Sequence, residues 1–190
     1  MTLCVIGDEL AAGIGDARGM GWVGRVVART AEPPPAYTLA VPEETTTALG
    51  ARWAGECRLR FSGEGDLLVI ALGAHDLVEG VSLARSRLNL ANILDDAGNS
   101  SVSTFVVGPP PRSDVDPAAQ EELSAAFADV CGRRRIPYAE TFEPLRNHEQ
   151  WHSDIAGGNG VLPGQAGYGL LAWLVLHNGW HDWVGLGPRE

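Results

Sequence analysis

The feature that most restricts the fold is an unbroken run of six apolar residues, Leu67 to Leu72. A strand with one face in water alternates apolar and polar side chains, so such a run predicts a strand that is covered on both faces. Strands of this kind belong to parallel sheets that lie between layers of helices. Other segments rich in apolar residues, which predict further strands, occur at 3–6, 37–41, 102–107 and 136–139.

Between these runs, the apolar residues follow the three-to-four-residue spacing of amphipathic helices. Asp116-Pro117 is typical of a helix start, and Gly98-Asn99 of a helix end. We expect a polar loop from Glu143 to Gly160. The predicted helices cover 22–30, 45–60, 81–97, 116–131 and 165–177. Strands that alternate with helices predict an α/β fold with a five-stranded parallel sheet.

Charge and cysteine content exclude several classes of protein. The net charge is -10, whereas a nucleic-acid surface needs clustered basic residues. The one basic run, at 133–135, follows a predicted helix, where cations meet the negative end of the helix dipole. Cys4, Cys57 and Cys131 have no metal-ligand spacing and are expected to be buried free thiols in a reducing compartment.

The start of the chain carries no predicted targeting segment. Residues 2–6 are apolar and follow no charged segment, unlike a secretory signal, and no apolar stretch reaches the length of a membrane span. We therefore expect a cytoplasmic protein that does not bind membranes. The high content of alanine, arginine and glycine is typical of a GC-rich bacterial source.

Five sequence blocks follow the predicted strands in order. Ligands of parallel sheets bind beyond the carboxyl ends of the strands, which is where most of these blocks lie. The blocks are Gly7-Asp8-Glu9-Leu10; Tyr37-Thr38-Leu39-Ala40-Val41 with Glu44-Thr45 and Arg52-Trp53; Gly73-Ala74-His75-Asp76; Val107-Gly108-Pro109-Pro110; and 158–163 with Ala166-Gly167-Tyr168. Together they resemble the blocks of the SGNH/GDSL hydrolase family. The resemblance implies a flavodoxin-like three-layer α/β/α sandwich, in a single domain over residues 1–190.

The same resemblance implies that the catalytic residues are replaced. In the family, a serine attacks an ester carbonyl, a histidine takes its proton, an aspartate orients the histidine, and an asparagine with backbone amides stabilises the oxyanion. The corresponding positions hold Glu9, Leu162, Asn159 and His75, in that order. The second-block glycine falls on Ala40 or Glu43, depending on register. Loss of the nucleophile or its base costs on the order of 10⁶ in kcat, so the family's serine mechanism is not expected.

We predict that Glu9 and His75 face each other, because the residues they replace both reach the same carbonyl oxygen. Desolvation is expected to raise the pKa of Glu9 toward neutrality, which would make the two side chains an acid/base pair. Asp8 and Asp76 are expected to anchor loops by accepting hydrogen bonds from backbone amides. The remaining residues predicted at a substrate cleft are Ala40, Glu43, Asn159 and Leu162.

The leading hypothesis is a repurposed enzyme that isomerises, eliminates from or cyclises a small organic molecule, in bacterial specialised metabolism. A second hypothesis is an inactive pseudo-hydrolase, in which Glu9 and His75 form a salt bridge and the protein binds a small molecule or a protein partner. Trp173, Trp180 and Trp183 could form a contact surface, although such aromatics more often pack the last helix onto the sheet.

A third hypothesis is a weak esterase in which Glu9 or His75 activates water. No cofactor is expected. A metal site formed by Glu9, His75 and Glu43 matches no ligand spacing, so none is predicted.

Overall fold

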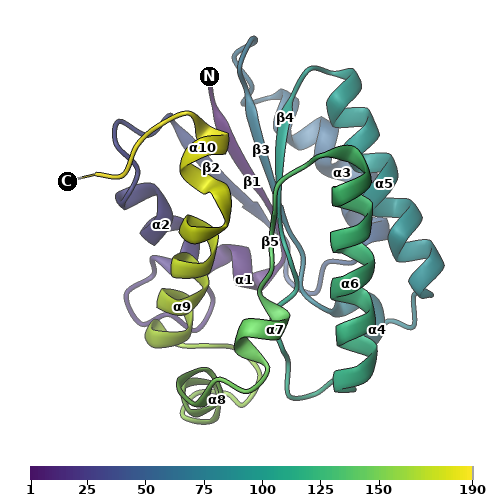
Figure 1. Ribbon diagram of the computed structural model, residues 1–190, viewed down its shortest axis with the longest axis vertical. Helices are drawn as coiled ribbons and strands as arrows, with labels where there is room; N and C mark the ends of the chain where they lie inside the picture. Colours follow the sequence, from purple (N-terminus) through teal and green to yellow (C-terminus); the bar gives the residue numbers. More distant parts are fainter. Residues whose placement is uncertain (190) are drawn as a thin grey trace.

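The computed structural model describes residues 1–189, and its centre is a five-stranded sheet with the strand order β2-β1-β3-β4-β5 (Figure 1). All neighbouring strands are parallel. The strands are β1 (Leu3–Gly7), β2 (Ala36–Ala40), β3 (Leu67–Ala71), β4 (Ser103–Val107) and β5 (Tyr138–Ala139). The unbroken apolar run forms β3, the central strand, in which every residue is buried. The predicted α/β class and five-stranded parallel sheet are therefore confirmed.

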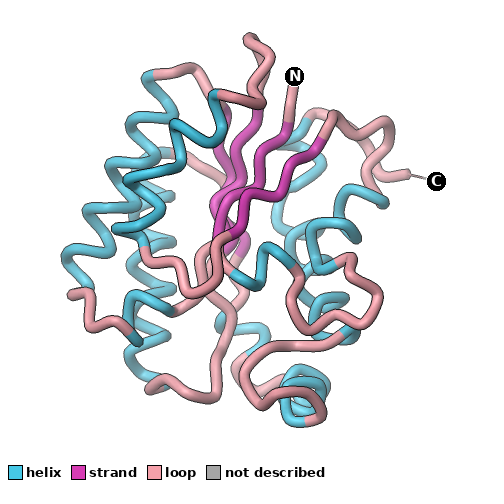
Figure 2. Tube along the Cα trace, turned by 180° about the vertical axis from the view of Figure 1, so that it is seen from behind, coloured by secondary structure: helices cyan, strands magenta, loops and turns pink. Residues whose placement is uncertain are grey.

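Helices cover both faces of this sheet, as seen from opposite sides in Figures 1 and 2. One layer contains α2, α9 and α10, and the other contains α3, α5 and α6. The helices are α1 (Glu9–Ala12), α2 (Gly21–Ala28), α3 (Thr46–Arg58), α4 (His75–Val78), α5 (Leu83–Asn99), α6 (Pro117–Arg134), α7 (Phe142–Leu145), α8 (Glu149–Ala156), α9 (Gln165–Val175) and α10 (His181–Val184), with a kinked segment, η1 (Leu176–Trp180), between the last two.

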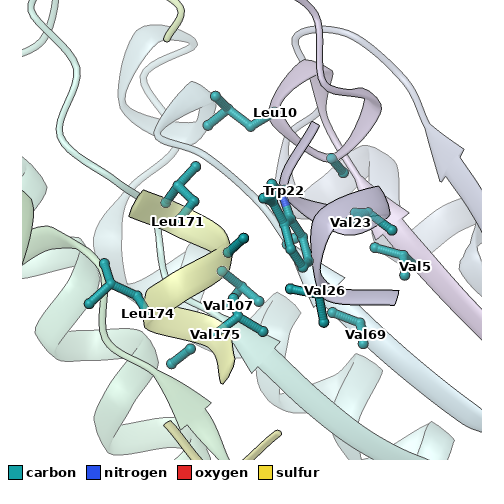
Figure 3. Packing of buried hydrophobic residues seen from close by; sticks show 14 of the residues in the cluster. Val5, Leu10, Trp22, Val23, Val26, Val69, Val107, Leu171, Leu174 and Val175 are labelled. Carbon is teal, nitrogen blue, oxygen red and sulfur yellow. The ribbon is translucent and has the colours of Figure 1, made fainter. Parts of the chain in front are cut away.

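The apolar strands are explained by two cores, one on each face of the sheet. Successive side chains of a strand point to opposite faces, and in β1 Val5 joins one core while Ile6 joins the other. On the first face, Trp22 of α2 lies close to Leu171 and Val175 of α9 (Figure 3). A strand that serves two cores needs apolar residues at every position, which is why β3 shows no alternation.

The structure corrects several predicted boundaries. The expected polar loop from Glu143 to Gly160 instead contains most of α7 and all of α8, which buries Trp151 and Ile155 on one face. The predicted end at Gly98 is also wrong, since α5 continues through Asn99. A Cβ atom at Gly98 would meet no neighbour within 4 Å, so this glycine fits an exposed helix at a modest propensity cost.

Other details of the sequence analysis are confirmed. Asp116 caps α6 by accepting a hydrogen bond from the amide of Ala119, with Pro117 at the first helical position. The cysteines in the described part of the chain are buried and free. Trp180 is buried and donates to Thr30, whereas Trp173 is 56% exposed. Within residues 1–189, no helix combines the length and apolar character needed to cross a membrane.

Candidate active site

The site lies where β1 and β3 end side by side. Gly7 pairs with Ala71 across the two strands, so the helices that follow, α1 and α4, begin at neighbouring points. A Cβ atom at Gly7 would lie 1.9 Å from the carbonyl oxygen of Ala71, and one at Gly73 would lie 2.5 Å from Asp8 Oδ2. Only glycine allows these close approaches, and they bring the first and third sequence blocks together.

Asp8 and Asp76 hold the loops of the site in place, as predicted. Asp8 is fully buried and accepts hydrogen bonds from the amides of Leu10 at 3.0 Å and Gly73 at 2.6 Å. Asp76 accepts from the amide and the hydroxyl of Thr46, both at 2.7 Å. These two carboxylates join the first, second and third blocks into one framework.

Glu9 and His75 meet at the centre of that framework. His75 Nε2 lies 2.7 Å from Glu9 Oε1, which confirms that the two side chains face each other. The other carboxylate oxygen of Glu9 accepts a hydrogen bond of 2.8 Å from the amide of Glu43. Glu43 has a φ of +60°, in the left-handed region that favours glycine. Of the two positions considered for the second-block glycine, Glu43 is therefore the one that presents its amide to the site.

Arg112, which the sequence analysis missed, completes the group. Its Nη1 atom lies 3.2 Å from Glu9 Oε1 and 3.0 Å from His75 Nε2. Gln120 holds its backbone at both the amide and the carbonyl, and Asp114 binds its guanidinium at 2.8 and 3.0 Å. Arg112 follows three consecutive prolines, and no pattern of spacing linked it to residues 9 and 75.

We call these three side chains the Glu9–His75–Arg112 cluster, and it is nearly closed to solvent. The exposed fractions of the side chains are 8% for Glu9, 5% for His75 and 8% for Arg112. A buried charge is stable only when it is paired and hydrogen-bonded. The cluster meets this condition because one carboxylate is shared by two cationic groups and a backbone amide.

The pKa of Glu9 differs from the value that the sequence led us to expect. Burial alone would raise the pKa of Glu9, but hydrogen bonds from His75 and from the amide of Glu43 lower it to about 2. The hydrogen bond to Glu9 in turn raises the pKa of His75. The expectation that Glu9 becomes a near-neutral base is therefore wrong: Glu9 is ionised, and His75 tends to stay protonated. Burial and the charge of Glu9 instead raise the pKa of Asp8 to about 7.

The remaining predicted residues lie around the cluster without joining it. Ala40 pairs with Gly7 and is half-buried, and the side chain of Glu43 is exposed. Asn159 closes a turn by accepting from the amides of Val161 and Leu162. Leu162 is half-buried and packs against the first core. Among residues 1–189, no hydrogen bond connects Asn159 to the cluster.

Three of the side chains offer a possible set of metal ligands. Ligand atoms of Asp8, Glu9 and His75 all lie within 4.8 Å of one another. A metal ion among them would be repelled by the guanidinium of Arg112, which contacts both Glu9 and His75. Both carboxylate oxygens of Asp8 already accept backbone hydrogen bonds. The geometry thus fits an internally neutralised cluster better than a metal site.

A parallel α/β sandwich with its polar site at the carboxyl ends of β1 and β3 is the architecture of a large class of hydrolases. The model of the GDSL-like Lipase/Acylhydrolase family matches residues 5–170, and the chain belongs to this family. A search of curated proteins finds no match to the sequence.

Solved structures support the same fold. The lipase/acylhydrolase from Enterococcus faecalis is 21% identical, with a TM-score of 0.79 and all of both chains covered. TesA is 21% identical with a TM-score of 0.74, over 94% of this chain and 98% of its own. Axe2, an acetylxylan esterase from Geobacillus stearothermophilus, is 19% identical with a TM-score of 0.73, over 93% of each chain. At these identities, the similarity establishes the fold alone.

Proposed function

We propose that this chain is a non-hydrolytic member of the GDSL-like family, in which the former catalytic position is filled by the Glu9–His75–Arg112 cluster. The observation that carries the proposal is that one carboxylate binds three donors of the site at once. Glu9 accepts from His75 and Arg112 through Oε1 and from the amide of Glu43 through Oε2. The protein would then act by binding a small molecule or a partner, and not by cleaving esters.

The position of the Glu9 carboxylate explains why hydrolysis is not expected. An active site of this family needs free hydrogen-bond donors for the oxyanion of the transition state. In this chain, a permanent anion already accepts hydrogen bonds from the amide of Glu43, the ring nitrogen of His75 and the guanidinium of Arg112. A second developing anion would be repelled by Glu9, and the attack of a carboxylate on an ester would give an anhydride instead of the usual acyl-enzyme.

The acid/base enzyme is the second candidate, and two pKa values favour it. The hydrogen bond to Glu9 raises the pKa of His75, which favours its protonated form, and the pKa of Asp8, at about 7, suits a group that exchanges a proton. Substrate would have to move Arg112 aside to reach either group, because the cluster is closed. We rank this candidate below the pseudo-hydrolase for that reason.

The test compares ester hydrolysis with and without the carboxylate. Purified protein and a Glu9→Gln variant are assayed with p-nitrophenyl acetate and butyrate across pH, with Glu43→Gln as control. Glu43 carries a carboxylate on the same rim, but only its backbone amide contacts the cluster. We expect all three proteins to match the uncatalysed rate.

Turnover that disappears in Glu9→Gln and persists in Glu43→Gln would refute the proposal, because it would mean that Glu9 or His75 activates water as a weak esterase. To separate the two remaining candidates, the variants are incubated with panels of small hydroxy acids and lactones, and products are followed by NMR. Conversion that needs Glu9 would favour the acid/base enzyme over the pseudo-hydrolase.

A further inference from the structure

An open hollow in the surface lies far from the Glu9–His75–Arg112 cluster. It has a volume of about 850 Å³ and is bordered by the last turns of α5 and α6 and by the starts of β4 and β5. These segments lie at the top of Figure 1, opposite the end of the sheet where α1 and α4 begin. The volume is within the range of roughly 300–1,000 Å³ that small-molecule sites occupy. We call it the α5/α6 cavity.

The walls of the α5/α6 cavity combine an apolar, aromatic part with polar side chains, among them Asp95, Ser103 and Thr104. Val102, Ile136 and Trp183 contribute to its lining. The ring of Trp183 is fixed from behind, since its centroid lies 5.2 Å from that of Phe105 and 5.3 Å from that of Trp180. A rigid indole beside aliphatic side chains is a surface on which a flat apolar group can pack without first ordering the wall.

The basic run of the sequence borders the same cavity. Arg133 is paired with Asp129 and lies outside the lining, whereas Arg134 lines the cavity and is paired with Asp95 at 2.7 and 2.8 Å. Arg135 also lines the cavity, and within residues 1–189 its side chain has neither an ion pair nor a hydrogen bond. Arg135 adopts a φ of +56° at the end of α6, a conformation that turns the chain there from the helix into the approach to β5.

We propose that the α5/α6 cavity binds a small organic anion with a flat apolar body, such as an aromatic carboxylate. The anionic group would bind the guanidinium of Arg135, which can hold a carboxylate through two parallel hydrogen bonds, and the ring would pack beside Trp183. Arg135 is exposed, and its guanidinium has no carboxylate partner among the described residues, so it is available to a ligand. This site is separate from the candidate active site and does not depend on the proposed function.

Binding is measured by isothermal titration calorimetry with two probes of similar shape, 1-naphthoate and neutral 1-naphthalenemethanol. We expect saturable binding of naphthoate and binding of the alcohol that is weaker by about tenfold or more, because the alcohol lacks the charge-assisted hydrogen bonds. Glu43→Gln should leave both affinities unchanged, since Glu43 lies at the other end of the sheet and its side chain is exposed there.

Three variants locate the site. Arg135→Gln should weaken naphthoate binding by about tenfold, while Arg133→Gln, which removes the same charge from the same run outside the cavity, should not. Gly98→Leu places a side chain at the cavity wall where a Cβ atom meets no neighbour within 4 Å, and leucine is a better helix former than glycine. It should abolish binding without unfolding the protein, which circular dichroism would verify.

Three outcomes would overturn the proposal: no saturable heat for naphthoate at millimolar concentration, equal weakening in the Arg135 and Arg133 variants, or undiminished binding in Gly98→Leu. The second would indicate a general attraction of anions to the basic run, and the third would place any bound naphthoate elsewhere on the protein.

Discussion

Removal of the Glu9 carboxylate should destabilise the protein most strongly in mildly acidic solution. A pKa of about 2, against 4.5 for an unperturbed glutamate, corresponds to about 3 kcal/mol of stabilisation of the ionised form, at about 1.4 kcal/mol for each pKa unit. The lowered pKa of Glu9 contributes stability above pH 4.5, and this stability is lost only as the pH falls toward 2.

The contribution of His75 to stability changes with pH in the opposite direction from that of Glu9. Its raised pKa contributes stability that is complete below 6.5 and is lost as the pH rises through the pKa of the folded state. Between pH 4.5 and 6.5, therefore, both contributions are fully present. In Glu9→Gln both are removed, and the guanidinium of Arg112, 3.0 Å from His75 Nε2, would no longer be neutralised. The histidine would then have to lose its proton.

The assay is urea unfolding followed by tryptophan fluorescence at pH 5.5 and pH 8.5. We expect Glu9→Gln to lose about 3 kcal/mol at pH 5.5, equivalent to a lower Tm by about 6–12 °C in a domain of this size, and to lose less at pH 8.5. Glu43→Gln should stay within about 0.5 kcal/mol of wild type, as exposed substitutions usually do. A loss below about 0.5 kcal/mol at pH 5.5, or one that does not shrink at pH 8.5, would contradict the reasoning.

Two further predictions concern the framework around the cluster. Asp76→Asn should destabilise the protein by about 1–3 kcal/mol, because an amide cannot accept both hydrogen bonds from Thr46; equal urea midpoints for the variant and wild type would show that this anchor is unimportant. Glu43→Gly should raise stability by up to about 1 kcal/mol, because glycine adopts a φ of +60° without the strain of a Cβ atom. Chemical unfolding at pH 7 measures the change, and a lower midpoint would argue against strain at this position.

The fold could be predicted well because its signals are local and repeated. An unbroken apolar run or a helical spacing can be recognised from residues that are close together in the sequence. The family resemblance added the order of the layers. The signals failed where a short element depends on contacts with the rest of the protein. The helix α8 exists because Trp151 and Ile155 are buried beneath it, and a segment of eight residues with two such anchors is too short to be distinguished from a polar loop by spacing.

The site was predictable only where the sequence blocks reach it. The meeting of Glu9 with His75 followed from the roles of the residues they replace. Arg112 was missed because it enters from a loop that no block describes, held by Gln120 at a distance of eight residues along the chain. The direction of the Glu9 pKa was wrong for the same reason: desolvation was considered, while the cation and the amide that compensate for it were not visible in the sequence.

The cluster also suggests why a carboxylate stands where the family has a serine. Donors arranged for a transient oxyanion are costly if they stay buried without a partner, at roughly 1–3 kcal/mol for each group. Under the proposed function catalysis is no longer under selection, and a side chain that supplies a permanent anion would satisfy those donors, as Glu9 does for Glu43 and His75. An apolar replacement would have left the amide of Glu43 unpaired. The presence of ionisable residues at this position is therefore weak evidence for catalysis, because a disused oxyanion site would itself favour a carboxylate.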